Sequence, residues 1–193
     1  MARRVNFRYS NANISLDDID KTFKKVISSL DIKYSKSKNL EYRSCFMGYK
    51  DEEVISEKAE IYKEVDKETC LTLFASVEAT LRTDFINRCH LKKKDKLSLF
   101  YRSGYNPSQR IYTYSLTDVV LKGWKSFLPQ YEQLIDQVND AFGYRNWLAH
   151  GRYWQLNQSL SKYDYFKLFI LLKGFITVIE SYIIEIPIDE YSI

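Results

Sequence analysis

Apolar residues recur along the first half of the chain at the three- and four-residue spacing of an amphipathic α-helix. The segment 15–30, SLDDIDKTFKKVISSL, begins with Ser15 as a candidate N-cap and continues with apolar residues at that spacing. The segment 57–89 contains neither glycine nor proline, and its apolar stripe predicts one long helix. Between residues 31 and 50 the pattern lapses, which favours a loop or a short strand-like connection.

The second half of the chain predicts three further helices. The segment 115–128 begins with a serine in capping position and ends before Pro129, and the segment 130–150 is closed by Gly151. The run from about 164 to 184 is strongly apolar, but two lysines and a glutamate interrupt it. Charges at that depth are costly in a bilayer, so a buried helix is favoured over a membrane span.

These patterns predict an all-α fold, a helical bundle of four to five helices. We expect residues 1–50 to form an N-terminal helical extension and residues 51–193 to form the helical domain proper. Hydrophobic residues make up 45% of the 193 positions and charged residues 28%, which is typical of a globular protein. The formal net charge of +4 is a weak indication of a polyanionic partner.

The cysteines and the N-terminus indicate a cytoplasmic protein. Cys45, Cys70 and Cys89 are far apart and never form a CxxC pair, so free thiols in a reducing compartment are expected. The first ten residues, MARRVNFRYS, lack the apolar region of a secretory signal. We expect neither a cofactor nor a metal, because no phosphate-binding loop, HExxH motif or serine-hydrolase elbow occurs.

Polar residues interrupt the apolar stripe near the end of the fourth predicted helix, in the stretch YRNWLAHGRYW from Tyr144 to Trp154. On a helical wheel Arg145 lies in the middle of that stripe. A buried guanidinium without a partner costs several kcal/mol or more, so an acidic group should face it. Glu78 lies on the apolar stripe of the long helix. We therefore predict an ion pair between Glu78 and Arg145.

His150 follows Arg145 by five residues, about 140° around the helix, and Asn146 shares its face. We call Arg145, Asn146 and His150 the polar corner. Gly151 suits the position after a helix end, where the negative end of the helix dipole favours an imidazolium. An imidazolium beside an arginine suits a phosphate. The competing interpretation is purely structural, with His150 as a helix cap and Arg145 in an ion pair.

The stretch RNWLAHG resembles the R-x4-H motif of the HEPN superfamily (higher eukaryotes and prokaryotes nucleotide-binding). The segment LFASVEATLR, residues 73–82, resembles that family's earlier long helix with its inward acidic residue, and the similarity extends over residues 51–193. The resemblance implies a dimerising helical domain that, in active members, cleaves RNA without a metal. Many such members are bacterial toxins or phage-defence effectors, and others have lost catalysis and serve as binding or scaffolding modules.

One group of HEPN proteins, paired with small nucleotidyltransferases, carries a tyrosine two residues after the motif histidine that the partner modifies. Here Arg152 occupies that position and Tyr153 follows it. Regulation of that kind is therefore not expected for this chain.

RNA cleavage by its own 2′-hydroxyl needs a proton acceptor, a proton donor and positive charge on the transition state. We expect Arg145 to supply the charge, His150 to carry the proton, Asn146 to orient the imidazole and Glu78 to fix Arg145. The chain has only two histidines, and His90 lies in an unrelated basic segment. A homodimer that brings two copies of His150 together would supply both proton carriers, although Tyr144 or Tyr153 is an alternative within one chain.

The expected substrate contacts are Arg152 with Trp154, to hold a phosphate and stack a base, and additionally Tyr153 and Tyr144. A lysine cluster, Lys92, Lys93, Lys94 and Lys96, is a second candidate for guiding RNA. The expected partners are RNA, a second copy of the chain and an antitoxin or defence-system protein, with no membrane. The alternative is a catalytically inactive module in which the same residues stabilise a dimer or bind a nucleotide or a protein.

Overall fold

The computed structural model describes residues 12–36, 40–91 and 93–184, and all regular secondary structure in these ranges is helical. The all-α prediction is therefore confirmed. In chain order the elements are α1 (Leu16–Lys33), α2 (Leu40–Cys45), α3 (Asp51–His90), α4 (Lys96–Gly104), the 3-10 turn η1 (Ile111–Thr113), the π-helix η2 (Leu116–Leu121), α5 (Lys122–Phe127), the 3-10 turn η3 (Pro129–Tyr131), α6 (Glu132–Ala149) and α7 (Tyr165–Glu180).

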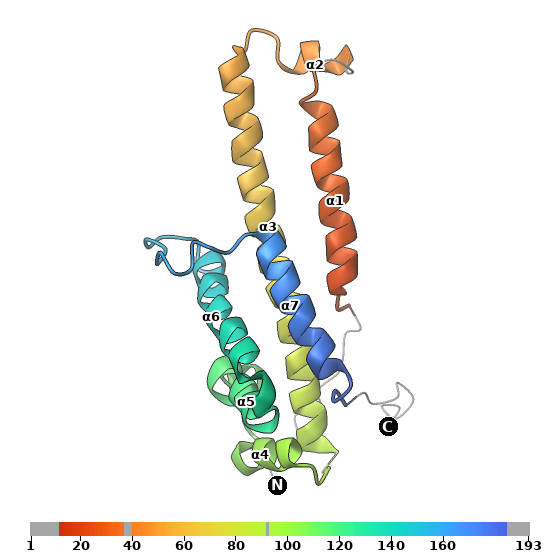
Figure 1. Ribbon diagram of the computed structural model, residues 1–193, viewed down its shortest axis with the longest axis vertical. Coiled ribbons are helices and arrows are strands. Elements are labelled where there is room, and N and C mark those ends of the chain that lie inside the picture. Colours follow the sequence, from red (N-terminus) through yellow and green to blue (C-terminus); the bar gives the residue numbers. More distant parts are fainter. Residues whose placement is uncertain (1–11, 37–39, 92, 185–193) are drawn as a thin grey trace.

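The forty-residue helix α3 runs the length of the molecule, and the other helices pack around it (Figure 1). Its first half pairs with α1, and the two helices project together beyond the rest of the fold. Helices α4, α5, α6 and α7 gather around its second half (Figure 1). The candidate site therefore lies on α6 where that helix packs against α3.

Serine hydroxyls cap the N-termini of two helices at the positions that the sequence predicted. The hydroxyl of Ser15 accepts a hydrogen bond of 3.1 Å from the backbone N–H of Asp18, and the hydroxyl of Ser115 begins η2 in the same way. Both predicted N-caps are therefore confirmed. The long helix begins at Asp51, six residues before its predicted start, because its first turn, rich in acidic residues, carries no apolar stripe that the sequence pattern would show.

Two sequence-based expectations about local structure were wrong. The predicted loop or strand-like connection between residues 31 and 50 contains the end of α1 and the short helix α2. The single helix expected over 115–128 is instead the π-helix η2 followed by α5. Neither a six-residue helix nor a widened helical turn produces a periodic apolar pattern long enough to be recognised in a sequence.

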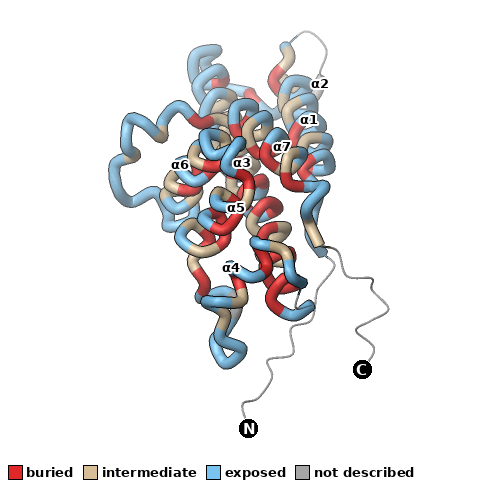
Figure 2. The backbone as a smooth tube through the Cα atoms, turned by 60° about the horizontal axis from the view of Figure 1, so that its bottom comes forward, coloured by how far each residue is buried: buried red, intermediate tan, exposed pale blue. Residues whose placement is uncertain are grey.

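One face of α7 is buried, as the interrupted apolar run predicted. The buried side chains recur at helical spacing: Tyr165, Leu168, Leu172, Phe175 and Ile179. The opposite face leaves Phe166 and Ile170 exposed. Figure 2 shows how the buried positions converge between α3, α6 and α7. No helix in the described ranges combines the length and the apolar character that crossing a membrane requires.

Helix α1 is tied to the same core. Phe23 stacks on Tyr165 of α7 with ring centroids 3.7 Å apart, and the Tyr165 hydroxyl donates a hydrogen bond of 2.6 Å to Asp20. Hydrogen bonds from Lys24 and Tyr165 hold the pKa of Asp20 below its ordinary value of 3.8. At the projecting end, Tyr34, Phe46 and Val54 form a separate small cluster. The proposed division at residue 50 stays a prediction.

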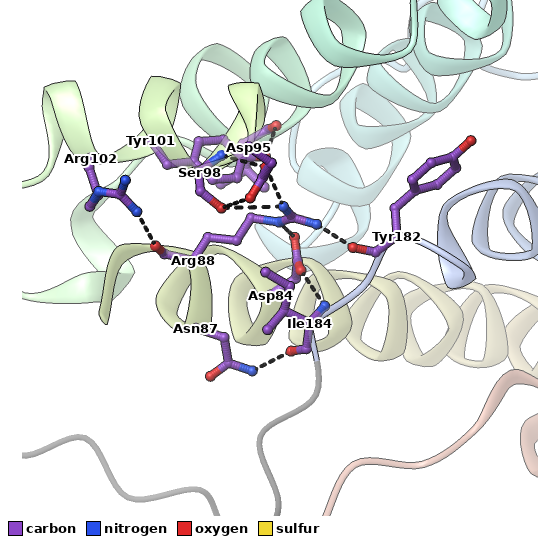
Figure 3. Close-up of polar contacts among 10 residues, drawn as sticks. Asp84, Asn87, Arg88, Asp95, Ser98, Tyr101, Arg102, Tyr182 and Ile184 are labelled. Carbon is purple, nitrogen blue, oxygen red and sulfur yellow. Dashed lines mark hydrogen bonds and ion pairs between the residues drawn. The ribbon is translucent and has the colours of Figure 1, made fainter. Parts of the chain in front are cut away.

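A buried polar network closes the lower end of the bundle (Figure 3). Arg88 of α3 is 2% exposed, and its guanidinium pairs with Asp84 at 2.7 Å and Asp95 at 2.9 Å and donates to the carbonyl of Tyr182. Asp84 accepts the N–H of Ile184 at 2.9 Å, and Asn87 donates to the carbonyl of the same residue at 2.7 Å. Three side chains of α3 thus hold the backbone that follows α7.

Candidate functional site

Helix α6 ends in a Schellman motif at the polar corner. Gly151 has a φ of +79°, and its N–H donates to the carbonyl of Leu148. The N–H of Arg152 donates to the carbonyl of Trp147 at 3.1 Å. His150 is the C-cap residue. The predicted roles of Gly151 as the residue after the cap and His150 as the helix end are therefore confirmed.

The predicted ion pair between α3 and α6 is present. Nη2 of Arg145 lies 2.8 Å from Oε2 of Glu78, and the other carboxylate oxygen of Glu78 accepts from Nε of Arg82 at 2.8 Å. The expected burial of the arginine was wrong, since its side chain is 32% exposed and that of Glu78 is 18% exposed. A long side chain covers apolar surface with its methylenes while its charged end reaches the edge of the interface.

Arg82 is a member of this network that the sequence analysis missed. Its Nη1 donates to the carbonyl of Tyr114 at 3.1 Å, so it links Glu78 to the chain just before η2. The available signal was its position four residues after Glu78, the spacing at which opposite charges meet on a helix surface. Glu78 thus accepts hydrogen bonds from two arginines, and the one on its own helix helps to orient the carboxylate toward α6.

Asn146 and His150 are both exposed. The side-chain oxygen of Asn146 accepts from Nη1 of Arg145 at 3.3 Å, and the bond that joins Asn146 to His150 is a main-chain bond of 3.1 Å. The side-chain oxygen of Asn146 therefore contacts the guanidinium of Arg145, and the expected role of Asn146 in orienting the imidazole stays a prediction. The three residues do form one polar surface at the end of α6.

Aromatic side chains follow the polar corner directly. Tyr153 is 83% exposed and Trp154 is 38% exposed. Their rings meet edge to face with centroids 4.7 Å apart, and the centroid of the His150 ring lies 6.3 Å from that of Trp154. The indole N–H of Trp147 donates to the carbonyl of Trp154 at 2.8 Å. The structure therefore brings these two predicted substrate contacts next to the candidate catalytic histidine.

The side chains of the other two predicted substrate contacts are less accessible to a ligand. Tyr144 is only 4% exposed and stacks between Trp147 and Tyr163, and its burial beside Cys70 raises its pKa. Its ring is packed in the core and is not presented to a ligand. Arg152 lies at the surface, but Nη1 of its guanidinium is 2.6 Å from Oε2 of Glu64 on α3.

The lysine cluster and the second histidine lie away from the polar corner. Lys93, Lys94 and Lys96 are exposed between the end of α3 and the start of α4, whereas Lys92 lies outside the described residues. Figure 1 shows α4 at the lower end of the bundle and the C-terminal end of α6 well above it. His90 bonds to the hydroxyl of Tyr105 at 2.9 Å in that lower region. The structure does not bring these groups to the motif.

Surface hollows also lie elsewhere in the described part of the chain. One of about 560 Å³ follows the outer face of the start of α6, from Pro129 to Asp140, and one of about 360 Å³ lies at the projecting end, beside Tyr34 and Ile55. Neither includes the polar corner. Within the described ranges no group of three histidine, cysteine or carboxylate side chains is placed to hold a metal ion.

Comparison with protein-family models, curated proteins and solved structures finds no match to this chain. The resemblance to the HEPN superfamily therefore stays a prediction that depends on residues 145–150 and their helical setting. A function for the chain has to be argued from the chemistry of the polar corner itself.

Proposed function

We propose that this chain is a metal-independent endoribonuclease of the HEPN type, in which the polar corner cleaves RNA through attack by the substrate's own 2′-hydroxyl. The observation that carries the proposal is the accessibility of the corner. A purely structural corner would bury both side chains, but His150 is exposed and the Arg145 side chain is 32% exposed. Groups left in solvent at a fixed helix end are available to a ligand.

The proposed chemistry follows from the two side chains. Arg145 presents a planar guanidinium, and Glu78 and Asn146 fix its position before any substrate arrives. Such a preset donor suits the negative charge that builds up on a phosphate oxygen in the transition state. An imidazole can accept or donate a proton, so His150 can take the 2′-hydroxyl proton or give one to the leaving 5′-oxygen.

A second proton carrier is supplied in this proposal by a second copy of the chain. His90, bonded to Tyr105 in the lower region, is not placed to serve, and Tyr144 is buried. The surface of α3 next to Glu78 carries short side chains, with Ala75 exposed and Ala79 half-buried. Short side chains let a second α3 approach closely, which would set two polar corners across a two-fold axis.

The test is a cleavage assay with single-stranded RNA in excess EDTA. The wild-type protein and His90→Ala should cleave, because neither needs a metal and His90 lies away from the corner. His150→Ala and Arg145→Ala should each lose cleavage while light scattering shows an unchanged dimer. The product should end in a 2′,3′-cyclic phosphate, and DNA or RNA methylated at the 2′-oxygen should be inert.

Three results would end this proposal: activity that EDTA removes and one divalent ion restores, full activity of a monomer, or cleavage of the 2′-O-methylated strand. Equal losses in His90→Ala and His150→Ala would also contradict it, because the two histidines serve different regions.

A second candidate function is a catalytically inactive module for dimerisation or for binding a nucleotide or a protein. The observation in its favour is that Glu78 already engages both Arg145 and Arg82, as it would in a purely structural network. The two candidates differ in the effect of His150→Ala, which removes cleavage under the first and has no cleavage to remove under the second.

The setting we propose for the ribonuclease is the cytoplasm, where it would act as a bacterial toxin or phage-defence effector held in check by an antitoxin or defence-system protein. Free cysteines support a reducing compartment: Cys45 is exposed, and Cys70 and Cys89 are buried without a disulfide. Co-purification of the untagged chain with a neighbouring gene product, followed by loss of toxicity, is the measurement for such a partner.

A further inference from the structure

The loop after the polar corner displays aromatic surface that the fold does not use. Tyr153 is 83% exposed, and Trp154, the residue beside it, is 38% exposed. Large aromatic side chains contribute most to stability when they are buried, so the Tyr153 ring in solvent and the partly exposed Trp154 ring leave apolar area unburied. Their position beside the polar corner makes the two rings available to a ligand of that site.

The backbone that carries these rings is held in place from both sides. The indole N–H of Trp147 bonds the carbonyl of Trp154 at 2.8 Å, and Arg152 reaches back to Glu64 of α3 at 2.6 Å. Arg152 also has a φ of +58°, a left-handed conformation that is uncommon for a residue with a side chain. Because the loop is already held in this way, it loses little further conformational entropy when a ligand binds to it.

The ring geometry leaves two differently oriented aromatic faces beside the imidazole. The Tyr153 and Trp154 rings are inclined at 80°, and the His150 ring is inclined at 38° to that of Trp154 with centroids 6.3 Å apart. A flat ligand that stacks on either ring would lie next to His150. Arg145 in the last turns of α6 and Arg152 just beyond it each pair with a glutamate through one guanidinium nitrogen, and their remaining N–H groups suit an anionic ligand.

We infer that Tyr153 and Trp154 form a stacking platform for the unpaired bases of a single-stranded nucleic acid beside the polar corner. In a duplex the base faces are already stacked, and only a single strand offers a free face to an aromatic side chain. The combination of flat aromatic faces with cationic neighbours favours a nucleic acid over a protein partner. The cleavage of the strand rests on the proposed function, whereas its binding does not.

The experiment measures binding without cleavage. The His150→Ala protein is titrated against fluorescein-labelled ten-nucleotide RNA, DNA of the same sequence and the matching RNA duplex, with anisotropy as the signal. Both single strands should bind and the duplex should bind far more weakly, because a base platform does not require the 2′-hydroxyl. Adding Tyr153→Ala or Trp154→Leu should weaken single-strand binding about 10-fold each, the usual effect of removing one base stack.

Tyr112→Ala is the matched control, since Tyr112 is 64% exposed on η1 and outside this loop. Its single-strand affinity should equal that of the His150→Ala parent. Trp154→Phe, which keeps an aromatic face, should retain most of the affinity that Trp154→Leu loses. Because Tyr153 is almost fully in solvent, its removal leaves the core intact and keeps the test independent of folding.

The outcomes separate the platform from the ribonuclease. Unchanged single-strand affinity in Tyr153→Ala and Trp154→Leu, or equally tight duplex binding, overturns the platform even if the wild-type protein cleaves RNA. Dissociation of the dimer in Tyr153→Ala would assign the rings to a protein contact and also overturn it. Ring-dependent binding of single strands by a wild-type protein that cleaves nothing supports the platform and removes the proposed function alone.

Discussion

Removing the Glu78 carboxylate tests how the α3–α6 ion network stabilises the fold. In Glu78→Ala, two charge-assisted hydrogen bonds of 2.8 Å disappear, and Arg145 and Arg82 are left facing each other with like charge. Breaking a fully buried pair costs about 3–5 kcal/mol. Here the two arginine side chains are 32% and 21% exposed. Water can therefore replace part of the lost interaction, and we expect a loss of about 1–2 kcal/mol.

The loss can be read from thermal and urea unfolding of the wild type and Glu78→Ala. For a chain of this size each kcal/mol lowers the Tm by about 2–4 °C, so a fall of about 2–8 °C is expected. Glu68→Ala is the control, because Glu68 is an exposed glutamate of the same helix. A double-mutant cycle with Arg145→Ala should give a coupling energy of about 0.5–1 kcal/mol, which isolates the cross-helix bond from the rest.

Two results would refute this reasoning. If Glu78→Ala loses no more stability than Glu68→Ala, or if the cycle shows no coupling with Arg145, the network does not hold the helices together. If the loss exceeds about 3 kcal/mol, the charges behave as a buried pair and the exposure of Arg145 is not what limits their contribution.

Three further predictions concern backbone, packing and pH. Gly151→Ala should lower the free energy of unfolding by about 1 kcal/mol because the φ of Gly151 is +79°. Gly174→Ala, in a helix with open space around it, should raise that free energy by about 0.5–1 kcal/mol. Urea unfolding compares the two variants. Gly123→Ala should cost about 1–3 kcal/mol, since its Cβ would lie 2.3 Å from a ring carbon of the buried Tyr101, and an unchanged Tm would contradict this. The pKa of Asp20 is lowered in the folded state, so its contribution to stability is present above pH 3.8 and is lost as the pH falls through the lower folded pKa. Amide exchange in α1 should accelerate in that pH range, and Asp20→Asn should not show this acceleration.

The helices could be predicted because their signals are local. Apolar spacing and the caps at Ser15 and Ser115 depend on residues within a few positions of one another, and these features appear in the structure where the pattern placed them. The π-helix η2 was not predicted, because it packs on α3, α5 and α6, and a local pattern does not record such contacts. The short helix α2 was not predicted, because six residues are too few to show a helical period.

The sequence predicted the ion pair of the site, but it did not predict how far the side chains of the site are buried. Arg145 and Glu78 each lay on an apolar stripe, and two opposite charges on facing stripes have few other possible ion-pair partners. How far each side chain is exposed depends on how α6 crosses α3, which no single-chain pattern gives. Tyr144 lies within α6 and is buried, whereas Tyr153 lies in the loop beyond the end of that helix and is exposed, so two tyrosines nine residues apart in sequence end in opposite environments.

The network around Arg88 has a consequence for synthesis of the chain on the ribosome. Arg88 and the carbonyl of Tyr182 are 94 residues apart, and at ribosomal rates of 5–20 residues per second the second arrives about 5–20 s after the first. During that interval a guanidinium destined for the interior has only its near neighbours as partners, and the apolar faces of α3 still lack α7. We expect these exposed apolar faces to attract chaperones during the interval, and a faster-translated message to shorten it.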